Sequence, residues 1–339
     1  GRKIMKWTSK ISSLIKDVEL RKNPVIPRIN KFNPDVFFIQ LDTFMVFPWF
    51  MDLPLNRTRS VFYFPSDGAG GMPLGCENIL KKVNMPVAMA KFGQKQVKDL
   101  YNIDSEYIPH AIDEKNYFPL PLEEREKLKA KYGLTGRFVV GTVARNQGRK
   151  MMDLTFKAFA IFCKDKPDAV LFLHTDPQDA AAVFNMQELA RRYKIANRVM
   201  FSGMTFFNGF SYKQMNEVYN VMDIFTLSTS GEGFGVPTIE AQACGIPVVI
   251  PNNTTGPELV LDDGKSGLLA DSAASITGSW SVERDIPDIN SLADCYSTLY
   301  HDKKKREAFG KVGRRKILES YTWENVNNQW DKLFTKLKI

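Results

Sequence analysis

Short apolar runs alternate along the chain with amphipathic stretches. Runs rich in β-branched and aromatic residues are the expected strands, and they are separated by patterns with helical spacing. This alternation is typical of parallel sheets with helices on both faces. The expected strands are 36–39, 61–64, 87–89, 107–108, 138–143, 169–173, 199–202, 224–227 and 247–250, and the clearest helices are 152–163, 186–193, 212–219 and 237–244.

The opening segment, residues 4–20, has a helical pattern of its own. We expect this helix to pack on its own sheet, and docking on an anionic membrane surface is the alternative. The apolar face carries Ile4, Trp7, Ile11, Leu14, Ile15 and Val18, and the basic face carries Lys3, Lys6, Lys10 and Lys16.

A change in composition between residues 119 and 136 indicates a domain boundary. Two prolines, a charged run and a glycine-containing turn follow one another there, and strand 138–143 starts immediately afterwards. We place the boundary near residue 130 and predict domains at 1–130 and 131–320, with a terminal segment at 321–339. Doubly wound domains of this kind bind ligands at the carboxyl ends of their strands. Two of them facing each other would form a central cleft.

Composition is that of a globular protein, with 44% hydrophobic and 25% charged residues among 339. No apolar run is long enough to span a bilayer, and the four cysteines are scattered, so we expect reduced, mostly buried thiols in a cytoplasmic protein. The net charge of +8 implies an anionic partner. Motifs for nucleic-acid binding are absent from the sequence. Phosphates of a ligand and an anionic membrane surface fit equally well.

The most informative stretch is residues 230–249, which read SGEGFGVPTIEAQACGIPVV. A strand ends just before it, a glycine-rich turn follows, and Pro237 suits the first turn of a helix. Gly231, Gly233 and Gly235 allow a tight turn and the close approach of a ligand. The exposed N–H groups of the helix start would suit a diphosphate or a sugar hydroxyl.

Two carboxylates, Glu232 and Glu240, flank this turn. A carboxylate can accept two hydrogen bonds from the vicinal diol that a ribose or hexose presents. The plain alternative is that Glu240 offsets the positive end of the helix while Glu232 is solvated. Within this framework of glycines and proline we favour the ligand-binding role.

The stretch resembles the signature of retaining glycosyltransferase family 4, which has two Rossmann-like domains in the arrangement called GT-B. The resemblance covers the motif Glu-Gly-Phe-Gly-x-Pro and the later Glu-Ala-x-Ala-x-Gly-x-Pro-Val. It implies that Glu240 holds the ribose of a nucleotide-diphosphate sugar and that Glu232 faces the donor sugar. It also implies that the backbone of Gly233, Phe234, Gly235 and Val236 lines the sugar and phosphate site.

A second match follows strand 138–143, where Arg145 and Lys150 stand at the spacing of the family's arginine and lysine. A leaving nucleoside diphosphate gains negative charge as the glycosidic bond breaks, and fixed cations stabilise that charge in the transition state. Arg149 is a further candidate. No D-x-D motif for holding a metal on a diphosphate occurs in the sequence, so we expect neither a metal nor another cofactor.

Weaker matches extend the resemblance to most of the second half. Residues 201–203 are expected beside the base, residues 255–260 match the segment after the next strand, and residues 321–324 match the start of a terminal helix that crosses back onto the first domain.

The N-terminal half matches less well. After strand 61–64 many family members have a histidine that meets the donor sugar, but here the chain has Ser66 and Asp67. We take these two residues as substitutes, and a simple turn at Asp67 is the alternative. His110 lies near the expected domain crossover, either as a ligand contact or as a structural histidine. The family's opening strand and Gly-Gly loop are not found before Pro34, so we expect this domain to lack its first βα unit.

The resemblance implies metal-independent transfer of a sugar to a glycan, lipid or small-molecule acceptor with retained anomeric configuration. Glu232 and Asp67 would position or stabilise the sugar, and peripheral contact with an anionic membrane would fit a lipid acceptor. Two alternatives stay open. One is another enzyme on this architecture, a nucleotide-sugar epimerase or a phosphorylase. The other is a catalytically silent module that binds a sugar nucleotide.

Overall fold

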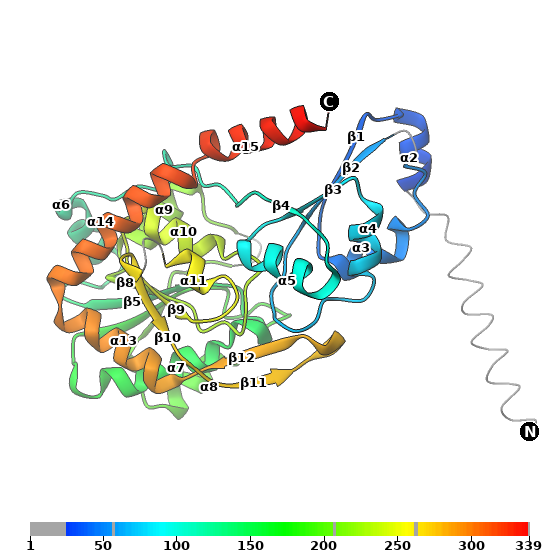
Figure 1. Ribbon diagram of the computed structural model, residues 1–339. Coiled ribbons are helices and arrows are strands. Elements are labelled where there is room, and N and C mark those ends of the chain that lie inside the picture. The colour runs from blue at the N-terminus through cyan, green and yellow to red at the C-terminus, as the bar shows by residue number, and fades with distance from the viewer. Residues whose placement is uncertain (1–24, 56–57, 206–207, 261–263, 338–339) are drawn as a thin grey trace, which may run out of the picture.

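The computed structural model describes residues 25–55, 58–205, 208–260 and 264–337. The helix predicted at 4–20 lies outside these residues, as does most of the segment in which the first βα unit was sought. Two parallel sheets form the frame of the described chain, each with its own helices (Figure 1). None of the described helices is long and apolar enough to cross a membrane.

The first sheet has four parallel strands in the sequential order β1-β2-β3-β4. All four coincide with predicted runs. The strands are β1 (Val36–Gln40), β2 (Arg59–Phe64), β3 (Met85–Ala88) and β4 (Glu106–Tyr107), and the helices of this unit are α2 (Val25–Phe32), α3 (Thr43–Phe50), α4 (Cys76–Lys82) and α5 (Lys91–Tyr101).

Alternation along β2 assigns the two faces of this sheet. Because successive side chains of a strand point to opposite faces, Phe62 and Phe64 share one apolar cluster with residues of α3, α4 and α5. Tyr63 faces the other way and meets Trp330 edge-to-face, with ring centroids 5.2 Å apart. That tryptophan belongs to α15 (Trp323–Lys336), so the terminal helix covers the second face of the first sheet (Figure 1).

The second sheet has six parallel strands in the order β10-β9-β8-β5-β6-β7. The chain runs outward from β5 in one direction and then returns to build the other half from β8, so the strand order reverses between β5 and β8. The strands are β5 (Phe138–Val143), β6 (Ala169–His174), β7 (Val199–Phe201), β8 (Ile224–Thr226), β9 (Val248–Pro251) and β10 (Gly267–Ala270).

Helices cover both faces of the second sheet, and the four predicted from the pattern are confirmed within a residue or two. Phe156 and Phe159 pack with Leu292 and Tyr296 on one face, whereas Val218 and Ile239 belong to the cluster on the other. The helices are α6 (Leu122–Lys131), α7 (Met152–Phe162), α8 (Met186–Arg192), α9 (Tyr212–Asn220), α10 (Val236–Ala243), α11 (Gly256–Leu259), α13 (Ile289–His301) and α14 (Lys303–Ser320), with short 3₁₀ turns η1 (Gly148–Lys150), η2 (Cys163–Asp165), η3 (Ala196–Arg198) and η4 (Ser279–Ser281).

An antiparallel hairpin follows β10 and was not predicted. It consists of β11 (Ser272–Thr277) and β12 (Glu283–Pro287), and it reaches from the second unit to the first (Figure 1). The backbone N–H of Glu283 donates to the carbonyl of Ala69 at 2.8 Å, and the N–H of Ala69 returns a bond at 3.1 Å. The hairpin therefore ties the two units together.

The chain just before the first predicted boundary packs on the second unit. The N–H of Phe118 donates to Asn216 at 3.0 Å and Arg125 of α6 donates to the carbonyl of Asn220 at 2.8 Å, so this part packs on α9. The boundaries at residues 130 and 320 stay predictions. All four cysteines are free thiols, and Cys295 alone among them is not fully buried.

Candidate functional site

Two loops meet where the strand order of the second sheet reverses, the position at which α/β sheets bind ligands. One loop follows β5 and contains Arg149; the other follows β8 and contains the glycine-rich turn. Ser228 Oγ donates to the carbonyl of Met151 at 2.7 Å, and the N–H of Ser230 donates to the carbonyl of Arg149 at 2.9 Å. These bonds hold the two predicted motifs side by side.

Glu232 is the centre of a buried charge cluster. Its Oε1 lies 2.6 Å from Lys150 Nζ and its Oε2 lies 2.9 Å from Arg149 Nη1, while only 11% of the Glu232 side chain is exposed. Burial acts to raise the pKa of Glu232, but the two cations outweigh it and hold that pKa below its ordinary value. Burial lowers the pKa of Lys150, and Glu232 only partly offsets this. The cluster therefore holds an ionised carboxylate against two cations in a poorly solvated place.

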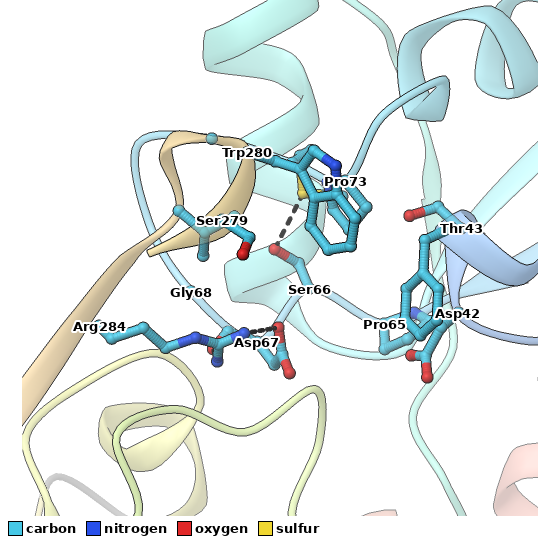
Figure 2. A pocket seen from close by; sticks show the side chains of 14 residues that line it. Asp42, Thr43, Pro65, Ser66, Asp67, Gly68, Pro73, Ser279, Trp280 and Arg284 are labelled. Atoms are coloured by element: carbon cyan, nitrogen blue, oxygen red, sulfur yellow. Dashed lines mark hydrogen bonds and ion pairs between the residues drawn. The ribbon is translucent and has the colours of Figure 1, made fainter. Parts of the chain in front are cut away.

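Asp67 extends this cluster into the first unit. Its Oδ2 lies 3.4 Å from Arg149 Nε. Its Oδ1 lies 2.8 Å from Nη2 of Arg284, a residue of β12 (Figure 2). Arg149 therefore contacts both predicted catalytic carboxylates, Glu232 and Asp67. Ser66, the other predicted substitute, is buried and its hydroxyl lies 3.2 Å from Met72 Sδ.

Two glycines of the turn serve a contact that the sequence did not predict. A Cβ on Gly231 would lie 2.1 Å from the carbonyl oxygen of Asp67, and a Cβ on Gly233 would lie 2.6 Å from the Cβ of Pro65. Both positions therefore admit the loop of the first unit at van der Waals contact. Gly235 has φ of 103°, a left-handed conformation that favours glycine, and it precedes the first residue of α10, Val236.

Glu240 has partners different from those of Glu232. It is the fifth residue of α10 and so lies on the second helical turn. Tyr219 Oη donates to Glu240 Oε2 at 2.5 Å, and Tyr117 also favours the charged form of this carboxyl group. Burial raises the pKa of Glu240, and the two tyrosines only partly offset this. The tyrosine pair was not identified from the sequence.

Arg145 lies apart from the Glu232 cluster. Its Nε lies 2.7 Å from Asp179 Oδ2, and its side chain is 46% exposed. The structure brings the predicted Lys150 to Glu232 together with Arg149, which was only a further candidate. The role of Arg145 stays a prediction.

His110 lies at the junction of the two units. Its ring meets Tyr63 edge-to-face at 5.3 Å and Phe234 at 5.0 Å between centroids. Burial lowers its pKa, so it is held as a neutral ring between aromatic neighbours. Phe234, predicted to line the donor site through its backbone, is itself buried.

His174 at the end of β6 gives a testable pH dependence. Burial lowers its pKa to about 4 from 6.5, and its Nδ1 lies 2.9 Å from the hydroxyl of Ser202. Because the pKa of His174 is lower in the folded protein, the unfolded chain takes up a proton at a higher pH than the folded protein does. The contribution of neutral His174 to the free energy of unfolding is therefore complete above about pH 6.5 and is lost as the pH falls towards 4. The full loss is about 3 kcal/mol.

The substitution His174→Gln should remove this part of the acid destabilisation. Urea unfolding at several pH values between 4 and 7 measures it, as the change of the unfolding free energy with pH in the variant against the parent protein. Parallel pH profiles for the two proteins would contradict the assignment.

We looked for metal-ligating side chains that lie close together in the described part of the chain. Among residues 25–55, 58–205, 208–260 and 264–337, His, Cys, Asp and Glu side chains form no group of three or more that could hold an ion. The predicted independence from metals is a matter for experiment.

Comparisons with known proteins identify the family. A model described as Glycosyl transferases group 1 matches residues 124–316, more than half of the chain. The GDP-mannose-dependent alpha-(1-6)-phosphatidylinositol monomannoside mannosyltransferase of Mycolicibacterium smegmatis is 26% identical over 225 residues, 64% of this chain and 53% of that protein. Mannosylfructose-phosphate synthase of Agrobacterium fabrum is 28% identical over 150 residues, 42% of this chain and 31% of that protein. The chain thus spans about half the length, or less, of these curated relatives.

Solved structures share the fold. Sucrose-phosphate synthase of Thermosynechococcus elongatus has a TM-score of 0.75 at 19% identity, covering 96% of this chain and 78% of that one. HepE of Anabaena, in complex with UDP and glucose, has a TM-score of 0.66 at 18% identity, covering 83% and 72%. These likenesses confirm the predicted architecture of two Rossmann-like domains. The chain belongs to the group 1 glycosyl transferases, in agreement with its resemblance to glycosyltransferase family 4.

Proposed function

We propose that the protein transfers a sugar from a nucleotide-diphosphate sugar to a hydroxyl group, with retention of anomeric configuration and without a metal. The observation that carries the proposal is the placement of Lys150 and Arg149 on Glu232 at the reversal of strand order. Cations at that position would contact a diphosphate bound at the start of α10.

The electrostatics favour the transition state over the ground state. As the glycosidic bond breaks, the departing diphosphate gains negative charge, and two fixed cations stabilise it without reorganising. Glu232 keeps both cations charged and oriented, since it bonds Lys150 through one oxygen and Arg149 through the other. This arrangement supplies the positive charge that a divalent metal would otherwise provide.

The proposed step replaces the bond from the sugar to the diphosphate with a bond from the sugar to the acceptor. The bond between the anomeric carbon and the diphosphate oxygen breaks, and the acceptor oxygen bonds the same carbon on the same face. The acceptor proton passes to the leaving diphosphate, so no side chain has to form a covalent intermediate. Asp67 and Glu232, both contacted by Arg149, position the sugar between the two units.

The relatives suggest which donors to try. The Mycolicibacterium relative is named for GDP-mannose and HepE holds UDP and glucose. We therefore propose a UDP- or GDP-hexose as donor and a glycan or lipid-linked glycan as acceptor. Cytoplasmic location and peripheral membrane contact stay predictions.

The proposal is tested by incubating the full chain with UDP-glucose or GDP-mannose and a panel of glycoside acceptors in EDTA. Proton NMR of the product reads the anomeric configuration of the new linkage. We expect a product with the α configuration of the donor. An inverted product, or sugar transfer that appears only after Mn²⁺ or Mg²⁺ is added, would overturn the mechanism.

A further inference from the structure

A pocket of about 280 Å³ lies where the hairpin meets the first unit. Its walls come from three segments: the start of α3, the loop after β2, and the hairpin with η4 at its tip. In Figure 2, Ser279 and Arg284 lie on one side of the pocket, and Asp42 and Thr43 lie on the other. Asp67 belongs to the wall of this pocket and is also contacted by Arg149. The pocket therefore adjoins the cation cluster.

Two exposed aromatic rings form the apolar part of the wall. Trp280 and Phe44 stack with centroids 5.7 Å apart and planes inclined by 20°, and the two residues are 48% and 45% exposed. Exposure of two such rings at a pocket is unusual for residues that only stabilise a fold.

The hairpin tip holds its tryptophan in a strained conformation. Trp280 and Ser281 both have φ of 58°, in the left-handed region that non-glycine residues rarely adopt. The tip is held by the first unit, because a Cβ on Gly71 would lie 2.6 Å from the carbonyl oxygens of both residues. Contacts between the two units therefore fix the position of Trp280.

Asp42 provides a polar group that the described structure does not use. Its carboxylate lines the pocket, and although Asp42 precedes α3 it makes no capping bond to that helix. Within the described part of the chain the Asp42 carboxylate makes no hydrogen bond or ion pair, whereas both Asp67 oxygens contact arginines. A ligand with hydroxyl groups would satisfy the Asp42 carboxylate.

These features together select one class of ligand. A pyranose ring has an apolar face of C–H groups that packs on aromatic rings, and hydroxyl edges that donate to carboxylates. The carboxylates of Asp42 and Asp67 disfavour a phosphate group in the same pocket. The volume is near the lower end of the range of about 300–1,000 Å³ for small-molecule sites, which suits one sugar ring better than acyl chains.

We propose that this pocket binds the acceptor sugar and that Trp280 and Asp42 select it. The proposal rests on the proposed function, since an acceptor beside Asp67 would lie next to a donor held by Arg149 and Lys150. Because the hairpin comes from the second unit and the rest of the pocket from the first, the acceptor site is complete only when the hairpin is docked.

The test uses the full chain with saturating UDP or GDP, and methyl α-D-mannopyranoside and methyl α-D-glucopyranoside as probes. Saturation-transfer NMR reads the dissociation constant of each glycoside. We expect saturable binding of at least one glycoside, weakened at least tenfold by Trp280→Ala and by Asp42→Asn. Trp323→Ala removes a similarly exposed tryptophan (53% exposed) outside the pocket and is the matched control. Nucleotide affinity should be the same in all variants.

A second arm identifies the source of the sugar. The same hexose is offered as a dodecyl glycoside in phosphatidylcholine vesicles. Tighter binding than to the methyl glycoside assigns a lipid-linked acceptor, and equal binding assigns a soluble glycan. Either result supports a sugar pocket.

Two outcomes would overturn the assignment of this pocket to the acceptor sugar while leaving the proposed function intact. In one, nucleotides bind but neither glycoside does. In the other, Trp280→Ala and Asp42→Asn bind the glycoside as tightly as the parent. If the parent chain bound neither UDP nor GDP, that result would instead count against the proposed function. Melting temperatures of the variants, with Trp280→Phe as the milder change, separate loss of the pocket from loss of the fold.

Discussion

Replacing Lys150 with alanine is expected to lower the turnover of sugar transfer by about 10²- to 10³-fold, the usual effect of removing one fixed group that stabilises a developing anion. Lys150 Nζ lies 2.6 Å from Glu232 Oε1 and its side chain is only 11% exposed, so water cannot replace the lost charge well. The effect should be larger on kcat than on the KM of the donor, because the diphosphate gains charge only as the bond breaks. Steady-state kinetics with the donor found in the product assay measures both.

The matched control for this variant is Lys127→Ala. Lys127 also pairs with a glutamate, Glu123, at 2.7 Å, but both side chains are mostly exposed on α6. Such surface pairs contribute little, so the control should keep its turnover within about twofold. Equal kinetics for Lys150→Ala and Lys127→Ala would show that Lys150 has no part in the reaction.

Replacing Glu232 with glutamine is expected to lower turnover by about 10²-fold while nucleotide binding is kept. Glutamine preserves the shape of the side chain but removes the charge that orients Lys150 and Arg149. Two neighbouring buried cations then repel each other, and a bound diphosphate would relieve that repulsion. The affinity for UDP or GDP should therefore stay the same or rise, while the sugar loses its positioning carboxylate.

Calorimetric titration of the nucleotide, together with turnover, checks this separation of binding from catalysis. Glu123→Gln removes an exposed carboxylate of the same kind and should change neither quantity. Unchanged turnover in Glu232→Gln would refute the role given to Glu232. A loss of nucleotide affinity as large as the loss of turnover would refute the assignment of that role to the sugar.

The strands and most helices could be predicted because their signal is local. Buried parallel strands such as β5 and β6 are continuous apolar runs, and all their residues are buried in the structure. The helix start at α10 is encoded by adjacent glycines and Pro237, which act on the backbone within a few residues.

The hairpin could not be predicted because its stability is not local. All six residues of β11 are exposed, and apart from Ile276 the strand carries only small and polar side chains, so it has no apolar face. What holds the hairpin is the first unit, through the Ala69 bridge and the contact of Arg284 with Asp67. These partners are more than two hundred positions away in sequence, where no periodic pattern connects them.

The site, like the fold, could be predicted where the signal is local. Glu232 and Lys150 lie in compact motifs, so the sequence pointed to both. Which arginine stands beside Glu232 depends on how the 3₁₀ turn η1 orients the loop after β5, and that turn places Arg149 there and leaves Arg145 with Asp179. Tyr219 reaches Glu240 from another helix, a contact that only the packing of α9 on α10 creates.

In the proposed mechanism, cations of the chain hold a nucleoside diphosphate beside Glu232 without a metal. The most direct test of this mechanism is the thermal unfolding of the full chain in EDTA with UDP, GDP or ADP at about 100 times the dissociation constant, compared with the Lys150→Ala variant. At least one nucleotide should stabilise the parent protein by about 2.7 kcal/mol, and the variant should lose most of that gain. Stabilisation that requires added Mg²⁺ or Mn²⁺, or that persists in full in Lys150→Ala, would contradict this mechanism.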